Sequence, residues 1–282
     1  MILVFGKNGQ VATEVRAQAS VHALDRHAAD LSDPQACAAK IIELKPEIVI
    51  NTAAYTAVDK AETEPDLAMR INGDAPTAMA RACAQLGIPF VHISTDYVFE
   101  GTGTHPQSPD QTVNPQSAYG RTKLAGETGI IEADGTYAIL RTSWVFSSTG
   151  SNFVKTMLRL GSEKDTLGIV ADQVGGPTPA GDIARACLKI GQTLKTDPSK
   201  TGVYHFSGTD DCSWADFAAA IFETAKITCK INPVPTTEFP RPAKRPANSR
   251  LDCSTTLASF GIERPDWRAA LKPMIAEIKE TT

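Results

Sequence analysis

The sequence predicts an α/β protein with a doubly wound parallel sheet and a smaller α/β part toward its C-terminal end. Short apolar runs alternate with amphipathic stretches through the first half of the chain, a pattern typical of a parallel sheet covered by helices. A glycine-rich turn follows the first apolar run, and the alternation loosens after residue 145. We therefore expect a first domain over residues 1–145, to which later segments return, and a mainly substrate-binding part over residues 146–282.

In the first half, apolar runs predict strands and amphipathic stretches predict helices. The strands are expected over residues 2–5, 21–24, 47–51, 88–94 and 136–141, and the helices over residues 10–19, 35–44, 67–86 and 117–132. Asp33 before Pro34 predicts a capped helix start, because proline is tolerated in the first turn. Gly87 predicts the end of the helix that precedes it.

In the second half, the elements are less regular. Helices are expected over residues 152–160, 180–194, 214–225 and 266–280, and strands over residues 167–170, 202–206 and 231–234. Residues 233–250 contain five prolines, too many for a helix or a central strand. We expect a long loop there, close to the active site, because such loops in compact enzymes usually bind ligands or act as lids.

Charge and composition limit the classes of partner. The chain is 42% hydrophobic and 21% charged, as in an ordinary soluble globular protein. A net charge of -4 argues against nucleic-acid or membrane-surface partners. Basic residues nevertheless gather in one segment, which forms either a site for a small anion or a solvated loop; they are Arg241, Lys244, Arg245 and Arg250.

Cysteine spacing and hydropathy bear on location. The six cysteines include no closely spaced pair, so we expect neither a zinc knuckle nor a small disulfide framework. No apolar run approaches the length of a membrane span. The first predicted strand begins at residue 2 and leaves no room for a signal peptide. We expect a cytoplasmic protein.

The turn after the first strand predicts a dinucleotide site. Gly6, Gly9 and Ala12 follow a buried strand and lead into a helix. Glycines at these positions let the backbone approach a pyrophosphate, and the N-terminus of the helix offers unpaired N–H groups to its charge. Because strand, turn and helix occur together, we interpret this segment as a Rossmann-type cofactor loop.

Residues after the next two strands refine that site. Asp25 ends the second strand, where a carboxylate can accept from the ribose hydroxyls, which favours NAD. Arg26 could instead pair with a 2′-phosphate, so NADP stays open. Asp30 and Leu31 either frame the adenine or form a helix-capping turn. Small side chains at residues 51–56 allow a flat dinucleotide to lie close to the sheet edge.

Tyr119 and Lys123 form the strongest catalytic pattern in the chain. Residues four apart lie on one face of a helix, so both side chains can point into one pocket. A free tyrosine has a pKa of about 10, and we expect the ammonium of Lys123 to lower it. Thr95, at the end of an apolar run, could hold the reacting oxygen. The pattern predicts reduction of a carbonyl or oxidation of an alcohol.

These features extend into motifs that cover nearly the whole chain. They are Gly-Lys-Asn-Gly-Gln-Val at 6–11, Asn-Thr-Ala-Ala-Tyr-Thr-Ala-Val-Asp-Lys-Ala-Glu at 51–62, Ser-Thr-Asp-Tyr-Val-Phe at 94–99, Tyr-Gly-Arg-Thr-Lys-Leu-Ala-Gly-Glu at 119–127, Arg-Thr-Ser-Trp-Val-Phe at 141–146, Asn-Phe-Val-Lys-Thr-Met-Leu at 152–158, Asp-Gln-Val-Gly-Gly-Pro-Thr at 172–178 and Arg-Pro-Ala-Asn-Ser-Arg-Leu at 245–251. With them the sequence resembles the dTDP-4-dehydrorhamnose reductase family of the extended short-chain dehydrogenase/reductase superfamily.

The resemblance implies a reaction and a set of roles. The family reduces the 4-keto group of dTDP-4-dehydro-β-L-rhamnose with NADPH or NADH, giving dTDP-L-rhamnose for polysaccharide biosynthesis. It implies that Tyr119 donates the proton, assisted by Lys123 and Thr95. The cofactor residues that it implies, beside Gly6 of the glycine turn, are Gly9, Gln10, Val11, Asp25, Asp30, Leu31, Ala54, Tyr55 and Thr56, together with Tyr119 and Lys123. The substrate residues that it implies are Val58, Thr95, Asp96, Trp144, Asn248 and Arg250.

Some family members form a magnesium-linked dimer through glutamates. Glu14 matches one of these glutamates and Glu277 another, but residues 179–182 lack the expected one. We therefore predict no metal site and favour surface carboxylates over Mg²⁺, in a monomer or a homodimer.

Two alternatives to the rhamnose reaction stay open. One is a reductase of another nucleotide-4-keto-6-deoxysugar, which sequence patterns separate poorly. The other is a non-catalytic subunit like the regulatory β subunit of methionine adenosyltransferase, which resembles this family. The intact Thr95, Tyr119 and Lys123 favour an enzyme.

Overall fold

A six-stranded parallel sheet forms the centre of the molecule, in a computed structural model that describes residues 1–281. The strand order is β10-β5-β4-β3-β1-β2, and every adjacent pair is parallel. The strands are β1 (Ile2–Phe5), β2 (Val21–Leu24), β3 (Ile48–Asn51), β4 (Phe90–Thr95), β5 (Tyr137–Thr142) and β10 (Gly202–His205). The predicted fold class is confirmed, and the order reverses between β1 and β3, where such sheets bind ligands.

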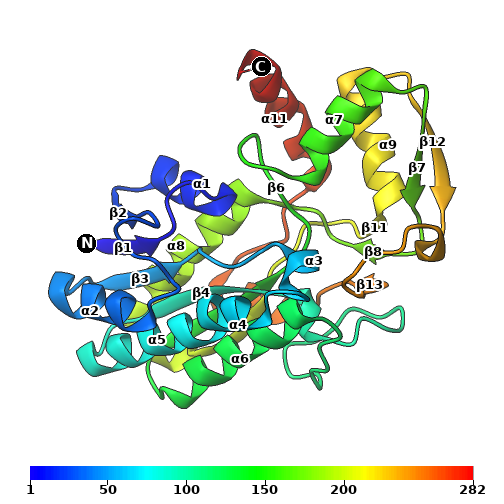
Figure 1. The fold of residues 1–282 in the computed structure, drawn as a ribbon. Helices are drawn as coiled ribbons and strands as arrows, with labels where there is room; N and C mark the ends of the chain where they lie inside the picture. Colours follow the sequence, from blue (N-terminus) through cyan, green and yellow to red (C-terminus); the bar gives the residue numbers. More distant parts are fainter. Residues whose placement is uncertain (282) are drawn as a thin grey trace.

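Helices cover both faces of this sheet (Figure 1). One apolar core joins the sheet to α1 (Gln10–Gln18), α8 (Ala180–Thr196) and α10 (Ser254–Phe260). The other joins it to α2 (Pro34–Leu44), α5 (Ala75–Leu86) and α6 (Ala118–Glu132). The Asp33 side chain accepts from the Ala36 N–H at 3.0 Å, and Gly87 ends α5 with φ of +66°. Both predicted helix boundaries are confirmed.

The predicted helix over residues 67–86 is wrong as a single α-helix. The segment contains α4 (Pro65–Met69), a π-helical turn (Arg70–Asp74) and then α5. Pro76 has no N–H for the carbonyl of Asn72, so a regular hydrogen bond is impossible there. One residue earlier, the Ala75 N–H bonds to the Arg70 carbonyl, five residues back, which is the π-helical pattern. The Asn72 side chain turns inward and bonds the backbone N–H and carbonyl of Tyr55.

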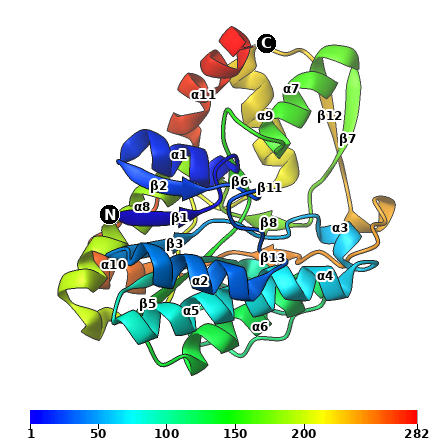
Figure 2. The same ribbon diagram turned by 60° about the vertical axis from the view of Figure 1, so that its left-hand side comes forward.

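The second part of the molecule is built around its own apolar core. It holds α7 (Phe153–Glu163), α9 (Trp214–Ala225) and α11 (Trp267–Thr281), with the parallel pair β7 (Thr166–Val170) and β12 (Lys230–Val234). Figures 1 and 2 show α7, α9, β7 and β12 grouped beside the main sheet, with α11 between this group and α1. Short strands connect the two parts: β6 (Val145–Phe146), β8 (Val174–Gly175), β9 (Thr178–Pro179), β11 (Cys212–Ser213) and β13 (Asn248–Ser249). The short helix α3 (Val58–Ala61) follows β3 and packs on α6 in the first part.

The proline-rich segment is only partly the predicted loop. Pro233 lies in β12, an edge strand of a two-stranded sheet, where the missing N–H of a proline is tolerated. Residues 235–247 form the loop itself, with a single 3-10 turn (Thr236–Glu238), and β13 follows it. The division of the chain at residue 145 stays a prediction. Three elements that follow this residue belong to the first part: β10 pairs with β5 in the main sheet, and α8 and α10 pack against that sheet.

Two further observations concern the whole described chain. All six cysteines are unpaired and buried. No helix within residues 1–281 combines the length and the apolar character that crossing a membrane requires.

Candidate active site

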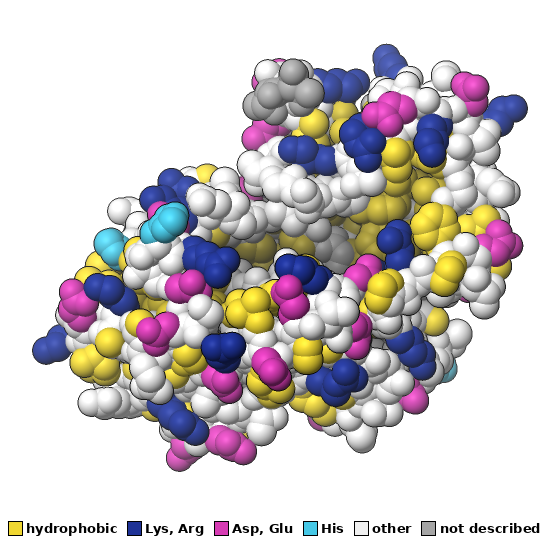
Figure 3. All heavy atoms as spheres, in the orientation of Figure 1, with side chains coloured by type: hydrophobic (Ala, Val, Ile, Leu, Met, Phe, Trp, Pro, Cys, Tyr) yellow, Lys and Arg dark blue, Asp and Glu magenta, His cyan; other side chains and the backbone are white. Residues whose placement is uncertain are grey.

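A cavity of about 1300 Å³ opens at the carboxyl ends of β1, β3, β4 and β5. Its opposite wall comes from α7, β7 and the start of α9, so both parts of the molecule contribute. Figure 3 shows the surface hollowed between these parts, with hydrophobic side chains inside the hollow. A drug-sized ligand usually needs about 300–1,000 Å³, so this cavity can hold two ligands side by side.

The glycine loop lies at one end of the cavity, and its backbone requires glycine. Gly6 has φ of +102°, and a Cβ there would lie 2.6 Å from Oγ1 of Thr52. Thr52 cannot easily move away, because its hydroxyl donates to the Phe5 carbonyl. Gly9 precedes α1, and no side chain caps the N-terminus of that helix. The loop therefore offers a close approach and N–H donors to a phosphate.

Gly6→Val is expected to weaken binding of a nicotinamide dinucleotide by about 10–100-fold, since a strained backbone costs about 1–3 kcal/mol and the new side chain fills the cradle. A fluorescence titration measures the dissociation constant. Gly202→Ala is the matched control, because Gly202 has ordinary φ, lies outside the cavity and leaves 3.5 Å to the nearest neighbour. Equal affinity of Gly6→Val and the wild type would contradict the assignment of this loop.

The residues predicted to hold the adenosine end lie beside this loop but do not line the cavity. The Asp25 carboxylate accepts from the N–H groups of Ala28 and His27 and from Lys7, and these bonds lower its pKa. Arg26 pairs with Asp30 at 3.2 Å. Asp25 is thus an ionised acceptor for the ribose hydroxyls. Arg26, the cation considered for a 2′-phosphate, is already paired with Asp30.

Three other predicted cofactor residues have structural partners. Asp30 accepts from the Ser32 N–H at 2.9 Å, so it forms a turn; the cap of α2 is Asp33. Leu31 is buried in the core with α2. The Tyr55 hydroxyl donates to Glu64 at 2.6 Å, and Tyr55 does not line the cavity. Among the remaining predicted residues, Gln10, Val11, Ala54 and Thr56 do line the cavity.

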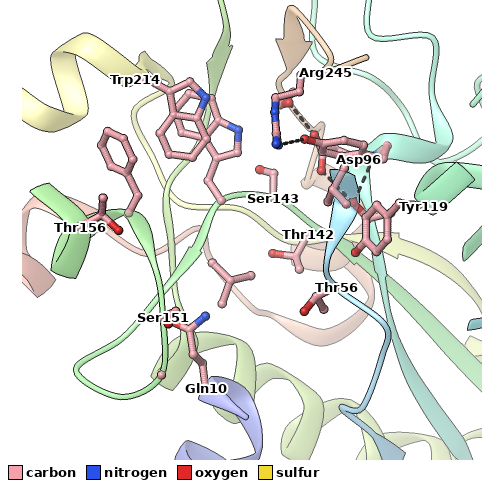
Figure 4. Close-up of a pocket in the computed structure, with 18 of the residues that line it drawn as sticks. Gln10, Thr56, Asp96, Tyr119, Thr142, Ser143, Ser151, Thr156, Trp214 and Arg245 are labelled. Atoms are coloured by element: carbon pink, nitrogen blue, oxygen red, sulfur yellow. Dashed lines mark hydrogen bonds between the residues drawn. The ribbon is translucent and has the colours of Figure 1, made fainter. Parts of the chain in front are cut away.

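Thr95 and Tyr119 meet at the floor of the cavity. Thr95 ends β4, and Tyr119 lies in the first turn of α6, which Ser117 caps by accepting from the Gly120 N–H. A Cβ at Gly120 would lie 2.2 Å from the Tyr97 carbonyl, so only glycine lets α6 approach this segment. That approach brings Tyr119 near Thr95, so that the Thr95 side chain influences the Tyr119 phenol, and both residues line the cavity. Figure 4 shows Tyr119 and Asp96 on one side of the cavity and Trp214 and Thr156 on the other.

The predicted effect of Lys123 on Tyr119 is wrong for the arrangement observed. Burial raises the pKa of Tyr119, and the nearby Thr95 side chain lowers it only in part. Nζ of Lys123 lies 2.9 Å from Nε2 of His92 and donates to the Ile93 carbonyl at 2.7 Å instead. Burial lowers the pKa of Lys123 to about 8, against the opposite effect of Glu127. Sequence spacing placed both residues on one face but could not reveal His92.

Asp96 follows Thr95 in the chain and is buried. Its carboxylate accepts from the hydroxyls of Thr95 and Ser249. Burial raises its pKa to about 6 despite those bonds. Asp96 lines the cavity, as predicted for a substrate residue, and orients Thr95 as well.

An aromatic wall faces the catalytic side. Trp144 stacks on Trp214 with ring centroids 3.5 Å apart, and Phe153 packs on Trp214 at 4.6 Å. Trp144 has φ of +50°, a strained conformation of the kind that clusters at ligand sites. Trp144 and Val58 line the cavity, as predicted. Trp214 and Phe153 were missed, because nothing local in the sequence shows that they meet Trp144.

Asn248 and Arg250 do not line the cavity, contrary to the prediction. The Asn248 amide donates to the carbonyls of Thr102 and His105, so it anchors a neighbouring loop. The Asn248 side-chain oxygen accepts from the Arg250 guanidinium at 3.1 Å, and this bond holds the Arg250 side chain beside Asn248, outside the cavity lining. Arg241 and Arg245, from the same basic segment, line the cavity instead.

Thr142 is a further cavity residue that the sequence did not single out. It ends β5 directly beside Thr95 in the register of the sheet. Its Oγ1 is buried and has no hydrogen-bond partner within residues 1–281. Because buried polar atoms are nearly always bonded, this hydroxyl fits a ligand that carries its own polar groups.

Of the carboxylates matched to a metal-linked dimer, Glu14 lies on α1 and Glu277 on α11, close enough for their charges to interact. Burial, and then the charges of Glu277 and Asp182, raise the pKa of Glu14. No group of three metal-binding side chains occurs in the part of the chain that was described. The absence of a metal-linked dimer stays a prediction.

Comparison with known proteins agrees with this geometry. The family model for the RmlD substrate binding domain matches residues 1–280. A dTDP-4-dehydrorhamnose reductase of Sinorhizobium fredii is 42% identical, over 97% of this chain and 96% of its own. A solved dTDP-4-dehydrorhamnose reductase of Clostridium acetobutylicum superposes with a TM-score of 0.92 at 41% identity, covering 99% of both chains. One of Bacillus anthracis, solved with NADP, has a TM-score of 0.90 at 35% identity, covering 98% of both chains.

Proposed function

Since this chain belongs to the RmlD substrate binding domain family, we propose that it reduces the 4-keto group of dTDP-4-dehydro-β-L-rhamnose to give dTDP-L-rhamnose, with NADPH or NADH as reductant. The observation that carries the proposal is the meeting of Thr95 and Tyr119 at the floor of a cavity that also contains the glycine loop. The chain is an oxidoreductase of the extended short-chain type.

The chemistry divides between the cofactor and the protein. A bound reduced nicotinamide supplies a hydride for C4 of the sugar. Tyr119 supplies the proton for the sugar oxygen, and its raised pKa keeps the phenol protonated at neutral pH. Thr95, which donates to Asp96 in the structure, turns its hydroxyl toward the same oxygen and orients it. Lys123 approaches the phenolate that forms and stabilises it.

The residues present fit a nicotinamide dinucleotide. The cradle at Gly6 would be filled by any Cβ, and the Thr142 hydroxyl lacks a protein partner in the described residues. Asp25 suits the ribose hydroxyls of NADH, while Arg26, if released from Asp30, suits a 2′-phosphate. Parallel titrations with NADH and NADPH decide the preference.

The nucleotide sugar fills the rest of the cavity, between the aromatic wall and the basic loop. Arg245 donates to Asp59 at 2.9 Å and to the Tyr97 hydroxyl at 3.1 Å, which fixes its guanidinium at the cavity edge (Figure 4). Arg241 lies over the Phe239 ring. A guanidinium matches a diphosphate in charge and geometry. We assign the diphosphate to Arg245 and Arg241, which line the cavity, and not to Arg250, the substrate residue that the resemblance implied.

Arg245→Ala is expected to raise KM for the nucleotide sugar by about 10–100-fold with a smaller change in kcat, because a charge-assisted hydrogen bond contributes about 1.5–3 kcal/mol. Steady-state kinetics at saturating cofactor measure both constants. Arg250→Ala, from the same segment but outside the cavity, is expected to leave KM within about threefold, as for other substitutions away from a site. A larger effect on KM at Arg250 than at Arg245 would contradict the assignment of the diphosphate to Arg245 and Arg241.

A panel of nucleotide sugars tests the substrate. The proposal predicts the highest kcat/KM with dTDP-4-dehydro-β-L-rhamnose and lower values with other nucleotide-4-keto-6-deoxysugars. If another sugar gave the highest kcat/KM, the proposed 4-keto reduction would still hold, but the proposed substrate would be wrong. No turnover with any of them, from folded protein that binds the cofactor, would favour a non-catalytic subunit. Whether the protein is a monomer or a homodimer is a separate question for light scattering.

A further inference from the structure

Three buried polar side chains form a chain of contacts behind the catalytic site. Asn51 and His92 are paired in the register of β3 and β4, and the Asn51 amide lies 3.1 Å from Nδ1 of His92. Nε2 of His92 lies 2.9 Å from Nζ of Lys123. All three residues are 1% exposed. A contact of this kind between imidazole and amine is open to only a few protonation states.

The backbone decides the orientation of Asn51. The Ala53 N–H donates to Oδ1 of Asn51 at 3.1 Å, and an amide N–H can only donate. Turning the Asn51 amide over would place two donors against each other and leave a buried N–H unsatisfied. Nδ2 of Asn51 therefore donates to Nδ1 of His92.

The orientation of Asn51 in turn decides the tautomer of His92. A neutral imidazole that accepts at Nδ1 carries its proton on Nε2. The doubly protonated form is disfavoured, because burial, the larger cause, lowers the pKa of His92. The Nε2–H consequently points at Nζ of Lys123. An ammonium has three N–H groups and no acceptor, whereas a neutral amine can accept once and still donate to the Ile93 carbonyl.

We propose that Asn51 and His92 are positioning residues that favour the neutral amine of Lys123 in the free protein, so that Lys123 binds its proton more tightly and leaves His92 when the dinucleotide binds. The second half of this statement rests on the proposed function. Other charged groups around Lys123 are Glu127 on the same helix, which favours the ammonium, and Arg141 from β5, which neutralises Glu127. From the segment after β4, Asp96 faces Tyr119. Burial, against the opposite effect of Glu127, lowers the pKa of Lys123, which is the direction that the proposal requires.

Nitrogen-15 NMR of the free protein tests the first half without any substrate. The ring shifts of His92 are expected to show the Nε2–H tautomer, and the Lys123 side chain is expected to titrate well below an exposed lysine. Asn51→Asp replaces the amide donor with an acceptor, so His92 should switch to the Nδ1–H tautomer and the Lys123 pKa should rise by at least about one unit. An Nδ1–H tautomer in the wild type would overturn the proposal.

A double-mutant cycle separates the tautomer from the new charge. In a His92→Leu background, Asn51→Asp is expected to raise the Lys123 pKa much less than in the wild type. An equal rise in both backgrounds would mean that the carboxylate acts through its charge alone. That result would refute the proposal that His92 transmits the effect of Asn51 to Lys123. His92→Gln, whose amide can donate at the position of Nε2, should keep the low pKa. The exposed His27 provides the control His27→Leu, which should change nothing.

Calorimetry with NADPH tests the second half. In buffers of different ionisation enthalpy at a pH above the Lys123 pKa of about 8, the wild type should take up a proton on binding, and Asn51→Asp should take up less. Equal proton uptake in both proteins would refute the coupling. Neither experiment needs turnover. A failure to reduce the proposed sugar would therefore not affect the proposed roles of Asn51 and His92, and a failure of those roles would not affect the proposed reaction.

Discussion

Tyr119→Phe is expected to lower kcat by about 10²–10⁴-fold, the usual contribution of a positioned proton donor, while the cofactor dissociation constant stays at its wild-type value. Only the phenolic oxygen is lost, and the ring keeps its edge contact with Tyr97, 5.4 Å between centroids. Stopped-flow reduction with saturating substrate measures the chemical step, and a fluorescence titration measures cofactor binding.

Tyr137 provides the matched control for this variant. It begins β5, at the opposite end of the strand from Thr142, and does not line the cavity. Tyr137→Phe is therefore expected to turn over normally. If Tyr119→Phe reacted as fast as Tyr137→Phe, the proton would have to come from another group, and the proposed roles of Thr95 and Tyr119 would fail together.

Glu127→Ala is expected to lower the free energy of unfolding by about 3–5 kcal/mol, because it leaves a buried guanidinium without its partner. Glu127 on α6 and Arg141 on β5 are 2.6 Å apart, with side chains 2% and 5% exposed. The carboxylate also accepts from the Ser94 hydroxyl, one residue before Thr95. This pair thus ties α6 to the strands that carry the catalytic floor. Urea unfolding followed by circular dichroism measures the loss.

Two further variants make that test specific. Glu132→Ala, at an exposed position on the same helix, should change the unfolding free energy by no more than about 0.5 kcal/mol. Removing both charges in Glu127→Ala/Arg141→Met should restore part of the loss, since no unpaired ion remains. A loss at Glu127 no larger than that at Glu132 would show that the buried pair contributes little.

Most of the main sheet could be predicted from the sequence, because its signals are local. The first five predicted strands match β1 to β5 with bounds that differ by at most two residues. The glycine loop is also local: the φ of Gly6 and the open N-terminus of α1 depend on adjacent residues. For the same reason, Thr95 and Tyr119 could be singled out from a strand end and a helix start.

The rest of the site depends on contacts between distant segments. Arg245 reaches the cavity because it pairs with Asp59, far away in sequence, and nothing in the basic segment distinguishes it from Arg250. The partner of Lys123 is His92, which depends on how α6 lies over β4. The Trp144–Trp214 stack likewise forms only when the two parts of the molecule come together.

The most direct test of the proposed function is oxidation of NADPH or NADH by the purified protein in the presence of enzymatically generated dTDP-4-dehydro-β-L-rhamnose. The proposal predicts oxidation that depends on this sugar, with dTDP-L-rhamnose formed in equal amount. Folded protein that binds the cofactor but oxidises neither dinucleotide when the sugar is added would contradict it.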